Sequence, residues 1–111
     1  MNIQIIGTKK CRDTKKAERF FKERRISFHF VDLNERALSP GEFNNIRSKS
    51  SAEDLLNTGS NAYKQGGFKY REFDIDEELF ENQQLLKTPI IRLDKDVLVG
   101  FDQDQLKKYL C

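Results

Sequence analysis

Residues 3–21 read IQIIGTKKCRDTKKAERFF, and this stretch changes character twice. A β-branched run at its start stops at Gly7, which is typical of a short strand with an apolar face. A basic turn follows and contains Cys11. Beyond the turn, apolar residues recur at the spacing of one buried helical face, which predicts an amphipathic helix over 13–25. These apolar residues are Ala17, Phe20 and Phe21.

A second strand is predicted over 27–33, where Phe28 and Phe30 lie on one face. Because a strand–helix–strand unit forms a right-handed crossover, its two strands are expected to be parallel. Asp13 and Thr14 are expected to cap the intervening helix, since short polar side chains accept hydrogen bonds from its first N–H groups.

The middle of the chain, from about 34 to 86, predicts short helices. The run SPGE at 39–42 has the spacing of a capping box with proline at the first helical position. Ser51 is expected to begin a second short helix and Asp76 to cap a third. A Gly-Gly pair at 66–67 separates these two helices.

Strands return near the C-terminal end. One strand is predicted over 87–93, entered through Pro89, and a tight turn at 94–96 leads to an antiparallel partner at 97–100. Asp102 is expected to cap a last helix.

The order βαβ, helical insert, ββα resembles the layout of the thioredoxin fold. It predicts an α/β protein with a mixed sheet of about four strands and helices on both faces. With 111 residues, the chain suits one compact domain, 1–111, with the helical insert at about 34–86.

The composition, 37% hydrophobic and 34% charged, is that of a water-soluble protein. Twenty basic and eighteen acidic residues leave a net charge of +2, which is too even to predict direct nucleic-acid binding. No apolar run approaches the ~20 residues of a membrane span, and the N-terminus does not resemble a signal peptide. We therefore expect a cytoplasmic protein that binds no membrane.

Cys11 is the candidate catalytic residue because it lies between a strand and a helix. The free N–H groups and the positive end of the helix dipole favour an anion there. Arg12 and the neighbouring lysines add positive charge, and the Thr14 hydroxyl can donate a hydrogen bond. These groups lower the thiol pKa from its usual ~8.5 and favour the reactive thiolate. The alternative is a small, inert filler at the helix start.

The other chemically distinctive residues have plainer interpretations. Cys111 is most simply an unpaired terminal thiol, with partnership to Cys11 as the alternative. His29 is expected on the strand surface, and no cluster has metal-ligand spacing, so no metal is expected. Pro89 is expected to be cis, because thioredoxin folds place a cis proline beside the active cysteine.

Four segments of the chain resemble the arsenate reductase (ArsC)/Spx family, in order and across essentially the whole length. KCRDTKKA at 10–17 resembles the active-site opening, and LLNTGSNAY at 55–63 resembles the insert segment "LLNT…Y". LKTPII at 86–91 resembles the "RPI" segment, and VGF at 99–101 resembles the C-terminal element. The resemblance implies a glutaredoxin-like thioredoxin fold.

The departures from the family pattern concern function. Arsenate reductases of this family hold the oxyanion near the thiolate with three arginines. Losing such bidentate donors weakens oxyanion binding, unless Arg92, Arg12 or Lys87 compensates. The residues at or near the expected arginine positions are Asn57, Gly59, Thr88 and Gly100.

The regulatory branch of the family, Spx, binds the RNA polymerase α-subunit and typically has a Cys-x-x-Cys switch. Here Thr14 stands in place of the second cysteine, which disfavours an internal disulfide switch. Ser51 falls near the glycine that Spx uses at its polymerase contact, which disfavours that partner.

The leading hypothesis is a glutaredoxin-like thiol–disulfide oxidoreductase. Cys11 is expected to form a mixed disulfide with a thiol or disulfide substrate, and an external thiol such as glutathione then resolves that mixed disulfide. No bound cofactor is expected. The alternatives are an Spx-like regulator that contacts the RNA polymerase α-subunit, and an arsenate reductase with an altered oxyanion site. The predicted site comprises catalytic Cys11, thiolate-stabilising Arg12 and Thr14, and substrate-binding Thr88, Pro89 and Arg92.

Overall fold

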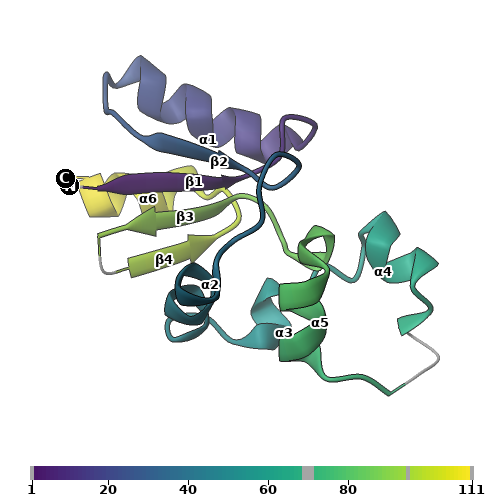
Figure 1. Ribbon diagram of the computed structural model, residues 1–111. Coiled ribbons are helices and arrows are strands. Elements are labelled where there is room, and N and C mark those ends of the chain that lie inside the picture. Colours follow the sequence, from purple (N-terminus) through teal and green to yellow (C-terminus); the bar gives the residue numbers. More distant parts are fainter. Residues whose placement is uncertain (1, 69–71, 95, 111) are drawn as a thin grey trace. The chain divides into compact units, whose positions relative to one another are not determined.

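The computed structural model describes residues 2–68, 72–94 and 96–110. The chain divides into two compact units, both drawn in Figure 1. The first unit comprises Met1–Asp32 together with Thr88–Cys111, and the second comprises Leu33–Lys87. Among the described residues, none of the helices has the length and apolar character needed to cross a membrane.

The first unit is built on a mixed four-stranded sheet in the order β2-β1-β3-β4. The strands are β1 (Ile3–Gly7), β2 (His29–Asp32), β3 (Ile90–Leu93) and β4 (Asp96–Val99). β1 pairs in parallel with β2, and β3 runs antiparallel to both β1 and β4. The parallel crossover and the C-terminal hairpin are therefore confirmed, although β2 and β3 are shorter than predicted and β4 begins one residue earlier.

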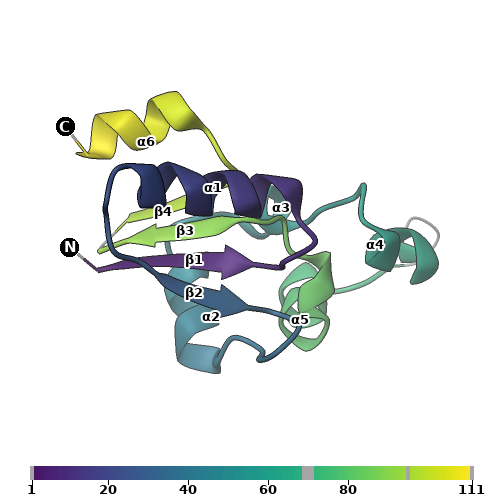
Figure 2. The same ribbon diagram turned by 90° about the horizontal axis from the view of Figure 1, so that it is seen from above.

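Two helices, α1 (Arg12–Glu23) and α6 (Gln103–Leu110), pack against the same face of this sheet (Figures 1 and 2). The apolar side chains of α1 are fully or almost fully buried there, as the helical spacing predicted. Opposite them, one residue from each strand lies in a single cross-strand row. This row consists of Phe30, Ile5, Ile91 and Leu98.

The predicted capping of α1 is wrong. The helix begins at Arg12, so its N-cap is Cys11, which makes no side-chain capping hydrogen bond. Asp13 is therefore inside the first turn and exposed, while Thr14 is fully buried.

The second unit contains short helices and no strand among its described residues. The capping box at 39–42 is confirmed, and Ser51 caps a helix as predicted. Asp74 rather than Asp76 caps the third predicted helix. Asp76 instead forms an ion pair with Arg47. The elements are α2 (Pro40–Arg47), α3 (Ala52–Leu55), α4 (Asn61–Gln65), α5 (Ile75–Glu81) and the short 3-10 helix η2 (Gln83–Leu85).

Two segments of the second unit meet just before Thr88. Leu56 and Leu86 form an isolated antiparallel bridge. On one side of it the Asn57 N–H donates to the Leu85 carbonyl at 2.8 Å, and on the other the Lys87 N–H donates to the Leu55 carbonyl at 2.7 Å. These bonds fix the backbone at Lys87.

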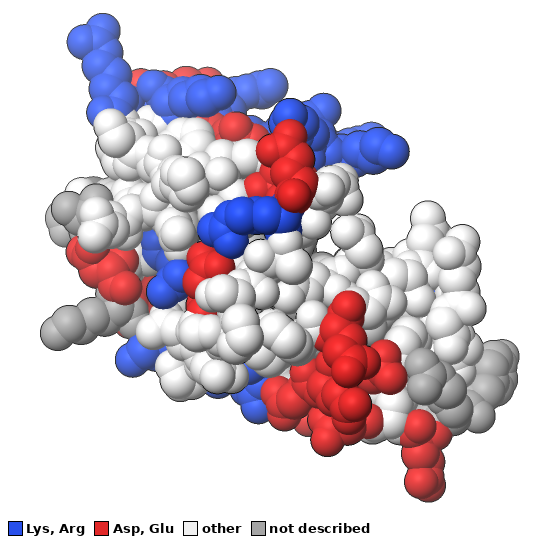
Figure 3. Space-filling model, in the orientation of Figure 1, with Lys and Arg blue, Asp and Glu red and all other residues white. Residues whose placement is uncertain are grey.

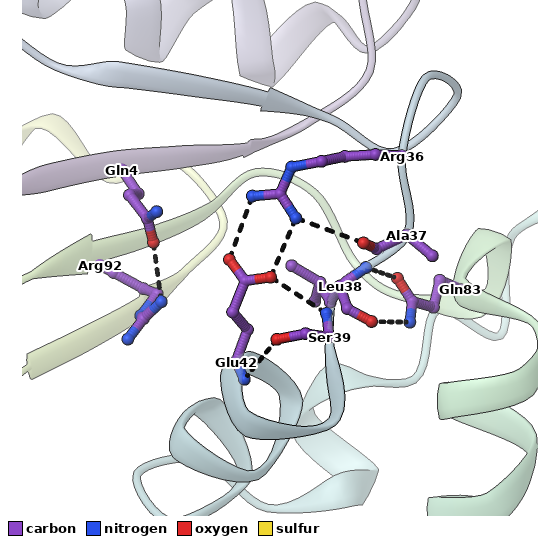
Figure 4. A network of polar contacts seen from close by, with 8 residues as sticks. All are labelled: Gln4, Arg36, Ala37, Leu38, Ser39, Glu42, Gln83 and Arg92. Atoms are coloured by element: carbon purple, nitrogen blue, oxygen red, sulfur yellow. Dashed lines mark hydrogen bonds and ion pairs between the residues drawn. The ribbon is translucent and has the colours of Figure 1, made fainter.

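A buried glutamine holds the loop before α2, as Figure 4 shows. Gln83 Oε1 accepts a hydrogen bond from the Leu38 N–H at 2.6 Å, and its Nε2 donates to the Leu38 and Phe80 carbonyls at 3.2 Å. The amide thus satisfies both backbone groups of Leu38 away from water. Close by, Arg36 makes a two-pronged ion pair with Glu42, which holds the pKa of that carboxyl at about 2.

A Gln83→Ala substitution is expected to destabilise the protein by about 2 kcal/mol, because two buried backbone groups lose their partner. The matched control is Gln84→Ala, which removes one exposed hydrogen bond to Asn34. Denaturant unfolding gives the free energy of unfolding of both variants. Equal effects of the two substitutions would contradict the role assigned to Gln83.

Candidate active site

Cys11 sits at the junction of a strand and a helix. It is the N-cap residue of α1, in extended conformation, and its side chain is half-buried. Its N–H donates to the Thr8 carbonyl at 3.1 Å, and its carbonyl accepts from the Lys15 N–H at 3.2 Å. The sulfur therefore lies at the positive end of the helix dipole, where an anion is stabilised.

Thr88 makes two contacts with this sulfur. Its Oγ1 donates to Cys11 Sγ at 3.0 Å, and Sγ donates in turn to the Thr88 carbonyl at 3.6 Å. The Thr88–Pro89 peptide bond is cis, as predicted. The sequence suggested only a backbone role for Thr88. Its hydroxyl was missed, although a hydroxyl residue directly before this proline was a usable signal.

The surroundings set the protonation of the thiol. Burial acts most strongly and raises the pKa of Cys11. The hydroxyls of Thr14 and Thr88, and the backbone N–H groups of Thr14 and Asp13, are donors near the sulfur and act in the opposite direction. Together they outweigh burial, so the pKa of Cys11 lies below that of an ordinary cysteine.

Thr14 is fully buried beneath the start of α1. Its hydroxyl lies near enough to the sulfur to lower the pKa, yet Oγ1 makes no hydrogen bond of normal geometry within the described residues. The direct hydrogen bond to the sulfur is therefore the one from Thr88, whereas Thr14 lowers the pKa of Cys11 without a hydrogen bond of normal geometry. Gly7 makes room for Thr14, because a Cβ at position 7 would lie 2.8 Å from Thr14 Cγ2 and closer still to Oγ1.

The other predicted site residues are spread over the first unit. Arg12 is exposed at the start of α1, and Pro89 is buried, with its carbonyl accepting from the Gly100 N–H at 2.7 Å. Arg92 lies further along β3, where its Nη1 donates to Gln4 Oε1 at 2.7 Å (Figure 4). The structure thus brings Thr88 to Cys11 and engages Arg92 within the sheet. The roles of these residues toward a substrate stay predictions.

At two places where the sequence departs from the family pattern, Gly100 and the turn at Asn57 and Gly59, the local backbone geometry suits the residues present. Gly100 has φ +86°, a backbone conformation that side-chain-bearing residues rarely adopt. In the second unit, Asn57 Oδ1 accepts from the Gly59 N–H at 3.0 Å within a tight turn. His29 is exposed on β2, and the described residues contain no cluster that could hold a metal ion. Cys111 lies outside the described residues.

A half-buried cysteine that caps the first helix of a βαβ unit, beside a cis proline that leads into an antiparallel hairpin, defines a thioredoxin-like protein. The chain belongs to the ArsC family, whose model matches residues 6–109. This agrees with the resemblance read from the sequence.

Some of the proteins similar to this chain are named as transcriptional regulators, and others as arsenate reductases. The chain is 25% identical to the global transcriptional regulator Spx 2 of Oceanobacillus iheyensis, over 99% of this chain and 84% of that protein. Among solved structures, a YFFB protein matches with a TM-score of 0.88 at 19% identity, covering 98% of this chain and 99% of that one. An arsenate reductase from Vibrio cholerae matches with a TM-score of 0.81 at 14% identity, covering 97% of each chain. At these identities the two structures show the fold alone.

Proposed function

We propose that the chain is a glutaredoxin-like thiol–disulfide oxidoreductase that uses Cys11 as its nucleophile. The observation that carries the proposal is the contact between Thr88 Oγ1 and Cys11 Sγ, because a hydroxyl donor on the sulfur favours the thiolate. The position of Cys11 at the N-terminus of α1 supports the same conclusion.

The reaction consists of two thiol–disulfide exchanges. The Cys11 thiolate attacks one sulfur of a disulfide; the old S–S bond breaks, a mixed disulfide forms, and the other half leaves as a thiolate. An external thiol such as glutathione then attacks the mixed disulfide and releases the Cys11 thiolate. Thr14 stands where a second cysteine would resolve the intermediate internally, which is why an external thiol is required. No bound cofactor takes part.

Each neighbouring group has an assigned task in this scheme. Thr88 and Thr14 stabilise the thiolate through their hydroxyls, and the exposed Arg12 adds positive charge at the helix start. The backbone beside Pro89 offers an edge on which a substrate peptide or thiol can align, with Arg92 as the more distant cation.

The pH dependence of Cys11 alkylation tests this proposal. It is measured in Cys111→Ser protein, so that Cys11 is the one thiol that reacts. The rate follows the thiolate fraction, so its midpoint is expected below the pKa of an ordinary cysteine, ~8.5. Thr88→Val removes a donor to the thiolate and is expected to raise that midpoint and lower the rate at neutral pH; Thr14→Val is expected to act in the same direction. The matched control, Thr58→Val, changes an exposed threonine in the second unit.

A midpoint at or above the ordinary value in the parent protein would remove the support for redox chemistry. An unchanged midpoint in Thr88→Val would show that its hydroxyl does not act on the sulfur.

A second candidate function is a regulator that acts by protein contact, favoured by the name of the curated relative. It predicts stable co-purification with RNA polymerase, through the α-subunit, that survives Cys11→Ser. Arsenate reduction ranks below both, because glycine, threonine or asparagine stands where oxyanion-binding arginines are expected. Arsenate-dependent turnover with glutathione and glutaredoxin tests it.

A further inference from the structure

The charge of this protein is unevenly distributed along the chain. Residues 12–25, which are α1 and the two arginines that follow it, carry seven basic and three acidic side chains, a net charge of +4. The rest of the chain carries −2, so the whole-chain value of +2 hides a strongly basic helix. Figure 3 shows Lys and Arg gathered over α1. Because a polyanion responds to a local basic surface, the nearly even total says little about what this helix attracts.

Four of these cations form one row on the outer side of α1. Their spacings of three, four and three residues place them on the side of the helix opposite its buried residues. At 1.5 Å per residue the row is about 15 Å long. All four side chains are exposed. This basic row consists of Arg12, Lys15, Arg19 and Lys22.

The basic row is only weakly neutralised by neighbouring carboxylates. Lys22 approaches Glu18 at 3.9 Å, but the lysine side chain is 70% exposed, so the pair is weak. In the part of the chain that the structure describes, Arg12, Lys15 and Arg19 form no ion pair. Exposed cations at regular spacing suit a ligand with regularly spaced anions, and a phosphate backbone is such a ligand.

A groove with an aromatic wall lies beside the basic row, between α1 and the start of α6. Phe20 is almost fully buried in it, with the Arg24 guanidinium 3.7 Å from the centre of its ring. The Phe101 ring packs edge-on against Phe20, with 6.1 Å between the ring centroids, yet Phe101 is only half-buried. Arg19 lines the groove as well and joins it to the row, while Glu23 is its one carboxylate. An accessible ring among cations is the arrangement on which unpaired bases stack.

The distribution of apolar residues argues against a lipid surface as the partner. Helices that bind membranes lay an apolar face into the lipid. The apolar residues of α1, Ala17, Phe20 and Phe21, are already buried in the core of the first unit. The helix therefore offers charge to a partner but no apolar face.

We propose that the basic row and the adjacent groove bind a single-stranded polynucleotide. Its phosphates contact the four cations, and one of its bases stacks on Phe101. The groove favours a single strand over a duplex, because the bases of a duplex are already stacked on one another. The inference concerns the outer side of α1 and does not depend on thiol chemistry at Cys11.

The experiment measures binding of the full chain to fluorescein-labelled oligothymidine by anisotropy. An oligomer of about 20 nucleotides exceeds the ~4–16 nucleotides of typical single-strand sites. Oligouridine and a DNA duplex of the same length are compared with it, as are vesicles of anionic phospholipid. Over about 0.05–0.5 M salt, log K is expected to fall with a slope of about −3 against log salt, since each of four phosphate contacts contributes about −0.7.

The test of the basic row is Lys15→Gln/Arg19→Gln, which removes two of its cations but keeps good helix formers. The slope is expected to fall in magnitude to about 1.4, and binding of oligothymidine at about 0.1 M salt to weaken more than about tenfold. The matched control is Lys49→Gln/Lys64→Gln, which changes two exposed lysines of the second unit and the net charge equally. It is expected to bind within about twofold of the parent.

The test of the groove is Phe101→Leu, which keeps an apolar side chain against Phe20 but removes the ring. Binding of oligothymidine is expected to weaken about tenfold, within the usual range for one stacked base, while duplex binding changes less than about twofold. Phe28→Leu is the matched control, because Phe28 packs against the same core and does not line the groove. Circular dichroism establishes that all the variants are folded.

Binding of either single strand with the expected slope supports the inference, and the tighter of the two shows whether DNA or RNA is preferred. Absence of binding at about 0.05 M salt would overturn the inference, as would equal weakening by the two lysine-and-arginine and lysine-only double variants. Equal loss of single-strand and duplex binding in Phe101→Leu would refute the stacking in the groove. Equally tight binding to anionic vesicles would show a surface for anions in general and would refute the choice of ligand.

Discussion

Cys11→Ser is expected to lose glutathione-dependent disulfide reduction by at least about a thousandfold, because a serine hydroxyl stays protonated where the thiol ionises. The contacts from Thr88 and from the N-terminus of α1 cannot compensate, since they stabilise a charge that serine does not develop near neutral pH. The assay is the reduction of hydroxyethyl disulfide by glutathione.

The control for this substitution is Cys111→Ser, which is expected to keep full activity. Circular dichroism and thermal unfolding establish that Cys11→Ser is folded, so that loss of activity reflects chemistry. Retention of the parent rate by a folded Cys11→Ser protein would exclude Cys11 as the nucleophile and leave the regulator as the better candidate.

Gly7→Ala is expected to destabilise the protein by about 3 kcal/mol, the upper part of the usual range for overpacking a core. The new methyl group would overlap the Thr14 side chain, and Thr14 is fully buried and cannot swing into solvent. Either β1 or the start of α1 must shift. Because Cys11 caps α1, the rate of Cys11 alkylation is expected to fall as well.

A double-mutant cycle isolates this contact. Thr14→Ala removes the Oγ1 and Cγ2 atoms that a Cβ at Gly7 would meet, so Gly7→Ala is expected to cost clearly less in the Thr14→Ala background. Gly41→Ala is the control, because a Cβ there meets nothing within 4 Å. Additive effects of Gly7→Ala and Thr14→Ala would show that the cost at Gly7 has another origin.

Much of the fold follows from local sequence patterns. The apolar spacing around Phe20 and Phe21 predicts α1, and the β-branched run before Gly7 predicts β1. The turn after β3 predicts the hairpin, and the SPGE run predicts α2. Each signal depends on neighbours in the sequence, and for that reason each survives in the structure with its ends displaced by a few residues.

The parts that could not be predicted depend on residues far apart in the sequence. Thr88 reaches Cys11 across a separation of 77 residues, and Gln83 reaches Leu38 across 45. The cap of α1 was misassigned because Asp13 and Thr14 are of the types that usually cap helices, whereas the helix begins earlier, at Arg12. Gly7 was assigned only as a strand stop, although a glycine in a strand also marks a close approach of another chain segment.

The hydrogen bond from Cys11 Sγ to the Thr88 carbonyl exists only while the sulfur carries its proton. Once the proton leaves, two electron-rich atoms face each other across that contact, while the bond from the Thr88 hydroxyl becomes charge-assisted and stronger. The thiol proton therefore holds the Cys11 sulfur against the Thr88 carbonyl, just before β3. In the proposed reaction, loss of this proton creates the nucleophile and, in the same event, frees the Thr88 carbonyl to accept a hydrogen bond from a substrate.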